Sequence, residues 1–178
     1  MPTQLKEKIN ISVDTLQELS QVDKADLCNI TEQAISAGGG FGWIRVPTID
    51  VLNEYWEKTT SDKLSKLVVG RLNGVIAGTL QLLYESPNVE SRKNIAQIRR
   101  HFVAPWARGY GLTKSMIDFS EDLAKEDNIK SIQLAIRETQ DAAVQLFKNK
   151  DYKGWGENPY YAFINGSFVK GIYFFKNL

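Results

Sequence analysis

Two glycines and an arginine stand close together in the stretch VAPWARGYGLTK, which runs from residue 103 to residue 114. Arg108, Gly109 and Gly111 lie where a strand pattern changes to a helix pattern. Each glycine costs a helix about 1 kcal/mol relative to alanine, so we expect a ligand that needs bare backbone to compensate. The free N–H groups and the dipole of a helix N-terminus attract anions, and glycine lets a phosphate approach without a Cβ in its way. The stretch is therefore a candidate phosphate-binding turn.

Other interpretations of the glycine-rich segments agree less well with the sequence. The stretch lacks the G-x-x-x-x-G-K-[ST] pattern of a P-loop, and Lys114 stands where the third glycine of a G-x-G-x-x-G fingerprint belongs. The segment GGGFG at 38–42 follows a helix pattern rather than a strand pattern, so we expect a flexible connection there. For 108–111 the alternative is a tight bend at a helix N-terminus that binds nothing.

Hydrophobic periodicity predicts the elements that must hold this turn in place. Strands are expected in 9–13, in a hairpin over 65–84 that turns at Asn73-Gly74, in 94–103, in 131–136, and in two final runs at 160–163 and 168–175. Helices are expected over 13–38, 49–60, 111–127 and 139–150, the last capped by Thr139 or Asp141. This order predicts an α+β fold with a mixed sheet and helices on both faces.

The composition is that of a globular protein, and it excludes several kinds of site. The 178 residues have a formal net charge of +1, and 43% of them are hydrophobic. Cys28 is the only cysteine and His101 the only histidine, so no intramolecular disulfide and no Cys/His metal site can form. The first residues lack the apolar core of a signal peptide. We therefore expect one cytoplasmic domain over 1–178, with no metal and no membrane partner.

The segment around the glycine turn resembles the acyl-CoA motif of the GNAT superfamily of N-acetyltransferases. The pattern V-x-P-x-x-R-G-x-G is present as Val103, Pro105, Arg108, Gly109 and Gly111, and the elements before and after it come in the order typical of that family. Farther on, QDAAVQLFKNKDY (140–152) resembles the family's N-x-x-A-x-x-L-Y-x-x-x-G-F. The resemblance covers residue 66 to about residue 152. It implies a mixed, mostly antiparallel central sheet.

The outer segments resemble a narrower group, the tabtoxin-resistance-type acetyltransferases. In that group a helix, a glycine-containing loop and a Tyr-Trp helix precede the hairpin, as in AISAGGGFGWIRVPTIDVLNEYW (34–56). A Pro-x-Tyr-Ala segment and an Asn-Gly or Asp-Gly loop follow near the end, and here Pro159, Tyr161, Ala162, Asn165 and Gly166 match them. The acceptor implied by this group is a small molecule, such as an amino-acid-like compound or toxin.

The resemblance also implies how acetyl-CoA, the co-substrate, is bound. Backbone N–H groups from Arg108 to Thr113 should hold the pyrophosphate, and the strand at 101–103 should run beside the pantetheine where the sheet splays apart. Phe147 should pack near the thioester, and a backbone N–H near Val103 should polarise its carbonyl. The candidate cofactor-binding residues are His101, Phe102, Val103, Arg108, Gly109, Tyr110, Gly111, Leu112, Thr113, Gln140 and Phe147.

The side chains that usually move protons in this family are absent. A free alkyl amine of pKa about 10 is only about one part in a thousand neutral near pH 7, so a base or a desolvating pocket is needed. Gln97 stands where many members have a Glu base, and Phe147 stands where the usual acid is a Tyr. Three interpretations follow. The enzyme works mainly by orientation and oxyanion stabilisation while waters or other groups move the protons, or other side chains serve as base and acid, or the site binds acyl-CoA without turnover.

His101 and Tyr161 are the candidate substitutes. His101 would serve as a base that titrates near neutrality, although a packed, hydrogen-bonded structural histidine is the simpler interpretation. Tyr161 would serve as an acid, although an aromatic residue of a terminal strand usually belongs to the core. The candidate catalytic residues are Val103, His101, Tyr161 and Gln97.

The predicted function is acetyl-CoA-dependent transfer of an acetyl group directly to a primary amine, with a small molecule as acceptor and a protein lysine or N-terminal amine as the alternative. A non-catalytic acyl-CoA-binding module is the alternative from another class, because Gln97 and Phe147 favour it. A nucleic-acid-binding module has only the basic run at 99–101 behind it, and the net charge argues against it. The apolar run IYFF at 172–175 is a candidate homodimer surface.

Overall fold

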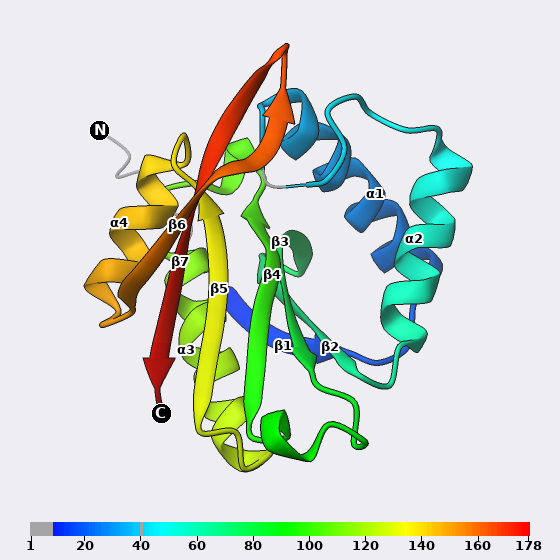
Figure 1. Cartoon of the computed structure of the whole chain (residues 1–178). Coiled ribbons are helices and arrows are strands. Elements are labelled where there is room, and N and C mark those ends of the chain that lie inside the picture. The colour runs from blue at the N-terminus through cyan, green and yellow to red at the C-terminus, as the bar shows by residue number, and fades with distance from the viewer. Residues whose placement is uncertain (1–8, 40) are drawn as a thin grey trace, which may run out of the picture.

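The computed structural model describes residues 9–39 and 41–178. Its seven strands form one sheet in the order β1-β2-β3-β4-β5-β7-β6 (Figure 1), and of their pairings only β4 with β5 is parallel. The strands are β1 (Ile11–Leu16), β2 (Ser65–Leu72), β3 (Val75–Tyr84), β4 (Ile95–Val103), β5 (Ser131–Arg137), β6 (Lys153–Ile164) and β7 (Ser167–Asn177). The predicted α+β class and the mixed, mostly antiparallel sheet are confirmed.

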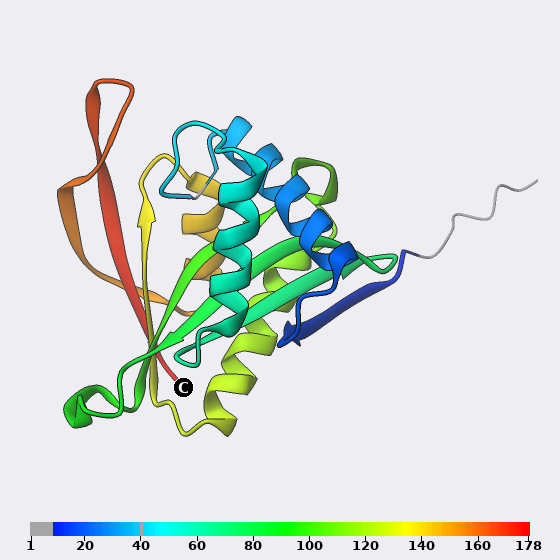
Figure 2. The same ribbon diagram turned by 90° about the vertical axis from the view of Figure 1, so that its right-hand side faces the viewer.

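Four α-helices of the described residues cover the two faces of this sheet. They are α1 (Gln21–Ser36), α2 (Ile49–Ser61), α3 (Leu112–Glu126) and α4 (Asp141–Asn149). Figures 1 and 2 show α1 and α2 on one face and α3 and α4 on the other. The central strand β3 is buried from Ile76 to Leu82, because helices cover it from both sides. The core therefore lies on both sides of β3 and its neighbours.

The predicted boundaries were wrong at two helix starts. Residues 13–16, expected in a helix, belong to β1 and pair antiparallel with β2, so tertiary strand pairing prevails over local helical spacing. Helix α1 instead begins after Ser20, whose Oγ accepts a hydrogen bond from the Asp23 N–H at 3.0 Å. The N-cap of α4 is Gln140 rather than Thr139 or Asp141, and its carbonyl accepts the Val144 N–H at 3.0 Å.

The C-terminal sequence folds into a longer hairpin than expected. Strand β6 begins at Lys153, well before the predicted run at 160–163, and the register shifts twice along its pairing with β7. The β2–β3 hairpin turns at Asn73 and Gly74 with φ of +50° and +87°, as predicted for a type I′ turn. The segment searched for a signal peptide falls mostly in residues 1–8, and residue 40 of GGGFG is the other position outside the described residues.

Asp151 ends α4 in a backbone conformation that suits glycine. The Tyr152 N–H donates to the Phe147 carbonyl and the Asp151 N–H to the Lys148 carbonyl, both at 3.0 Å, which is a Schellman motif with Asp151 at φ +65°. The resembled family pattern has Gly at this position. The strain at Asp151 is therefore confined to one residue, and a glycine at this position would relieve it.

We expect Asp151→Gly to raise the free energy of unfolding by about 0.5–1 kcal/mol, because it removes left-handed strain without changing a core contact. Chemical denaturation measures the change. Asn149→Gly is the matched control, since residue 149 is the last helical residue and glycine there should destabilise by about 1 kcal/mol. Equal changes at both positions would contradict the assignment of strain to Asp151.

Candidate functional site

Strands β4 and β5 separate along half of their length. Their parallel pairing runs from Ile95 with Ser131 to Gln97 with Gln133, and no pair is formed beyond it in the described residues. Strand β4 nevertheless continues to Val103 and β5 to Arg137. The two strands therefore present unpaired edges to each other, and backbone N–H and C=O groups there are open to a ligand.

The N–H of Val103 belongs to this open edge. The next residue, Ala104, donates its N–H to the Ala77 carbonyl beside β3 at 2.8 Å. Successive residues of a strand direct their N–H groups to opposite edges. The Val103 N–H is consequently directed away from β3, toward the gap between β4 and β5.

A bulge in β4 changes the direction of the side chains next to the gap. Thr79 of β3 pairs with Phe102 and Gln81 pairs with Arg99, so β4 has one extra residue between these pairs. Arg100 within the bulge has φ +48°, which is a disfavoured conformation for an arginine. Both Arg99 and Arg100 extend over the face that faces α2, where Arg100 reaches the side chain of Gln81.

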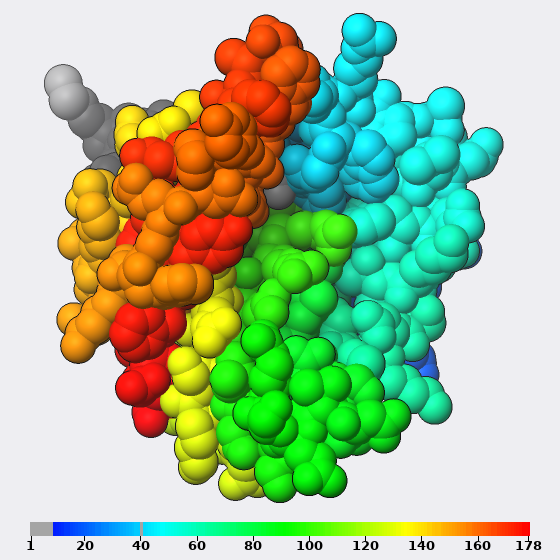
Figure 3. All heavy atoms as spheres, viewed as in Figure 1, coloured from blue at the N-terminus to red at the C-terminus, as the bar shows by residue number. Residues whose placement is uncertain are grey.

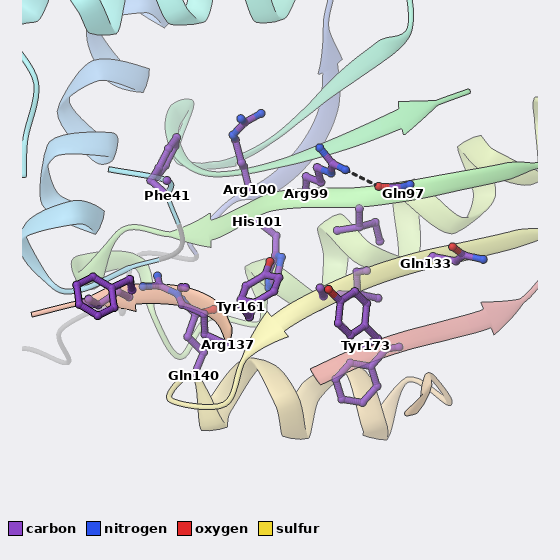
Figure 4. Close-up of a pocket in the computed structure, with 18 of the residues that line it drawn as sticks. Phe41, Gln97, Arg99, Arg100, His101, Gln133, Arg137, Gln140, Tyr161 and Tyr173 are labelled. Carbon is purple, nitrogen blue, oxygen red and sulfur yellow. Dashed lines mark hydrogen bonds between the residues drawn. The ribbon is translucent and has the colours of Figure 1, made fainter. Parts of the chain in front are cut away.

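A pocket of about 660 Å³ opens on this face of the sheet. Its floor comes from β4, β5 and β7, and its walls come from the loop after α1 and from β6 (Figure 4). Figure 3 shows the surface hollowed where the β6–β7 hairpin approaches that loop. The residues that line the pocket are Phe41, Gly42, Ile44, Gln97, Ile98, Arg99, Arg100, His101, Gln133, Leu134, Ala135, Arg137, Gln140, Trp155, Tyr161, Ala162, Phe163, Ile164, Tyr173 and Phe174.

Three arginines make the pocket electropositive, because no Asp or Glu is among the described residues that line it. Arg99 Nη2 donates to Gln97 Oε1 at 2.8 Å. Arg100 Nη1 donates to Gln81 Oε1 at 3.2 Å, and its guanidinium lies 5.3 Å from the centre of the Tyr55 ring. Arg137 Nη2 donates to the Gly39 carbonyl at 3.0 Å and so ties the loop after α1 to β5.

His101 extends from the bulge toward β5 (Figure 4) and has an unsatisfied ring nitrogen. Part of the residue lines the pocket, but Nε2 is buried without a hydrogen-bond partner in the described part of the chain. Its ring packs edge-on against Phe147, 5.0 Å between centres, and Phe147 is fully buried. Burial lowers the pKa of His101 from 6.5 to about 4. The expected titration near neutrality is therefore wrong, and His101 is neutral at pH 7.

The glycine turn lies after β4 and a 3₁₀ turn at Pro105–Ala107. Gly109 and Gly111 have φ of +86° and +78°, and a Cβ at either position would meet no described heavy atom within 4 Å. Gly111 is the N-cap of α3, and no described side chain caps the first N–H groups of that helix. The turn thus offers bare backbone and free donors to an anion.

The sequence-predicted residues fall into two groups. Gln97, His101, Gln140 and Tyr161 line the pocket. The others lie outside its lining, with Phe102, Leu112 and Phe147 buried and Arg108 to Gly111 exposed in the turn. Val103 and Thr113 are partly buried, the first at the open edge and the second in the first turn of α3.

Sequence reasoning missed Gln133, Arg137 and Tyr173, which also line the pocket. A signal for the first two was present, because the alternation of SIQLAIR places them opposite the buried residues of β5. Tyr173 lies beside Ala135 in the β5–β7 pairing, which only the fold reveals.

The described residues contain neither a metal-binding cluster nor a membrane-spanning helix. No group of three or more His, Cys, Asp or Glu side chains there is arranged to hold a metal ion. None of the helices in that part of the chain is both long and apolar enough to cross a membrane.

Known proteins share both the sequence pattern and the fold. The acetyltransferase (GNAT) family model matches residues 34–152. An uncharacterized N-acetyltransferase from the hisH–hisA intergenic region of Azospirillum brasilense is 37% identical over 131 residues, which are 74% of this chain and 78% of that protein. An N-acetyltransferase structure from Staphylococcus aureus Mu50 has a TM-score of 0.79 at 16% identity, covering 94% of this chain and 98% of the other. A Salmonella typhimurium structure that contains acetyl-CoA as its cofactor has a TM-score of 0.76 at 16% identity, covering 94% of each chain.

Proposed function

The chain belongs to the acetyltransferase (GNAT) family and is an N-acetyltransferase, and we propose that it transfers the acetyl group of acetyl-CoA directly to a primary amine of a small molecule. The pocket of about 660 Å³ supports this acceptor class, since small-molecule sites typically have about 300–1,000 Å³. The observation on which the proposal rests is that this pocket opens onto the gap between β4 and β5. We propose that one domain performs both binding and transfer.

The family uses acetyl-CoA, and the residues present suit that molecule. We assign its pyrophosphate to the N–H groups of the turn from Arg108 to Thr113, where Gly109 and Gly111 leave space and α3 contributes its positive end. We assign the pantetheine to the unpaired edges of β4 and β5, beside Phe102, Val103 and Phe147. Gln140, at the N-cap of α4 and in the pocket lining, would lie near the same path. Bound there, acetyl-CoA supplies the acetyl group as a thioester.

We propose that backbone polarisation and the positive pocket together support transfer without a carboxylate base. We assign the Val103 N–H, which is directed into the gap, to stabilisation of the oxyanion that would form when the amine attacks the thioester carbonyl. Nearby guanidinium charges disfavour the ammonium form of the acceptor and so lower its pKa. Gln97 can hold a water but accepts no proton at neutral pH, and His101 with a pKa of about 4 is a weak base. We therefore assign Gln97 and His101 to positioning and to proton relay through water.

Tyr161 is the assigned donor to the leaving thiolate, and its ring lies directly over Gly171 of β7. A Cβ at Gly171 would approach Tyr161 Cγ to 2.3 Å, so alanine there must displace the ring. We expect Gly171→Ala to lower kcat about a hundredfold while the affinity for CoA stays the same, as for loss of one positioned proton donor. Steady-state kinetics and CoA titration measure the two effects.

Gly156→Ala is the matched control for this prediction, because it adds the same methyl group to β6 where no described atom lies within 4 Å. Tyr161→Phe removes only the hydroxyl. Full turnover in Tyr161→Phe would remove Tyr161 from the acid role, whatever Gly171→Ala does.

A non-catalytic acyl-CoA-binding module is the second candidate, favoured by Gln97 and Phe147 at the positions of the usual base and acid. Thermal unfolding with acetyl-CoA and with CoA, followed by thiol release against an amine panel, separates the two. A rise in Tm with thiol release supports transfer. A rise in Tm without release from any amine supports the binding module, and no rise with either ligand contradicts both.

A further inference from the structure

Positive charge is concentrated in the pocket, and two of its arginines lack an acidic partner in the described part of the chain. The whole chain has a formal net charge of only +1, yet three arginines and no described Asp or Glu line this single cavity. Two arginines elsewhere are neutralised by carboxylates: Arg71 pairs with Asp14 and Asp23, and Arg92 pairs with Glu85. Arg99 and Arg100 form no ion pair with a carboxylate of residues 9–39 or 41–178, so their charge is available to a ligand.

Neutral amides, rather than acids, hold these two side chains in place. The hydrogen bonds from Arg99 to Gln97 and from Arg100 to Gln81 fix the guanidinium groups without cancelling their charge (Figure 4 shows the first). The Tyr55 ring supports Arg100 from the side of α2. A fixed, unneutralised guanidinium is arranged to pair with an oxyanion in two-point geometry.

The backbone at Arg100 is strained where the two arginines reach the pocket. In a regular strand, consecutive side chains point to opposite faces. The bulge and the φ of +48° at Arg100 instead bring both arginines to the face of the pocket. Disfavoured backbone of this kind costs about 1–3 kcal/mol and is found mostly at functional sites. Neither arginine is fully buried, since Arg99 is exposed and Arg100 partly buried, so both can reach a ligand in the pocket.

We propose that the acceptor is a primary amine that also bears an anionic oxyacid group, a carboxylate or a phosphonate, and that Arg99 and Arg100 bind this group. The inference rests on the proposed function and names the substrate class of the same site. It excludes polyamines and other polycationic amines, which this pocket repels. Specificity then comes from the anion, while the amine is directed toward the gap between β4 and β5.

The test compares acceptors that differ only in the anionic group. The panel contains the twenty common amino acids, their amides, the corresponding decarboxylated amines and 1-aminoalkylphosphonates. The readout is the rise in Tm of the CoA-saturated protein as each compound is titrated. This measurement gives an affinity and needs no turnover. We expect at least one anionic compound to bind about ten- to hundredfold more tightly than its amide, as for a charge-assisted pair. The carboxylate and phosphonate arms identify which oxyacid is preferred.

Variants test the two arginines. Arg99→Gln should abolish the preference for the anion and leave the affinity for CoA unchanged. Arg100→Asn should do the same, and asparagine tolerates the positive φ at this position. Arg92→Gln, outside the pocket, is the control and should keep the preference. Loss of CoA affinity in the Arg99 and Arg100 variants would assign these residues to the cofactor and overturn the proposal.

The inference and the proposed function fail in different ways. If amides and decarboxylated amines bind as well as the anions, or no anion binds, the inference is wrong. Thiol release with uncharged amines alone would then still support the transferase function. Conversely, anion-selective binding that Arg99→Gln removes, without thiol release from any acceptor, supports the inference on the pocket and contradicts transfer.

Discussion

Gly111→Glu is expected to weaken CoA binding at least about a hundredfold. The substitution puts a carboxylate at the N-cap of α3, where the assigned pyrophosphate contacts bare N–H groups. Two effects act in the same direction: the side chain fills the space left by the missing Cβ, and its charge repels the phosphates at close range. Isothermal titration of CoA into the purified variant measures the loss.

The control must separate this effect from backbone strain, because Gly111 has φ +78° and any L-residue is disfavoured there. Gly166→Glu provides it. Gly166, in the β6–β7 turn, has φ +83° and equally open surroundings. A glutamate at this position therefore adds the same backbone strain and the same charge, but at a distance from the glycine turn. CoA affinity that falls equally in both variants, or in neither, would contradict the assignment of the pyrophosphate to the turn from Arg108 to Thr113.

The order of the elements could be read from the sequence because each element has a strong local signal. The hairpin at Asn73-Gly74, the alternation of SIQLAIR and the glycine turn each depend on neighbours a few residues apart, and the structure has them where they were predicted. The end of β1 could not be read, because residues 13–16 have helical spacing and become a strand only by pairing with β2, more than fifty residues away.

The pocket was less predictable than the fold for the same physical reason. Its walls come from the loop after α1 and from β6, which meet β4 only after the chain has folded. The bulge at Arg100 is a register shift between β3 and β4, and a register shift has no local sequence signature. The basic run at 99–101 therefore resembled surface charge in the sequence, whereas in the structure it lines the pocket.

His101 illustrates how burial by distant segments reverses an inference from residue type. A histidine titrates near pH 6.5 in the unfolded chain, but Phe147 and the strands around Nε2 lower its pKa in the folded chain to about 4. The unfolded state therefore binds a proton between pH 6.5 and pH 4 that the folded state does not bind. The free energy of unfolding must fall as the pH falls through this window, by at most about 3 kcal/mol.

We expect His101→Leu to lose most of this pH dependence, because leucine has no proton to bind and the ring environment is apolar. Urea denaturation at pH 7 and pH 5 measures the free energy of unfolding in both proteins. The acidic groups with lowered pKa, Asp23, Asp118 and Asp127, lose stabilisation mainly below about pH 4 and contribute alike to the wild type and the variant. The change in the free energy of unfolding between pH 7 and pH 5 therefore reports mainly the protonation of His101. If the wild type and His101→Leu lose equal stability between pH 7 and pH 5, Nε2 is not desolvated. His101 would then titrate near neutrality and would again be a candidate for the general base.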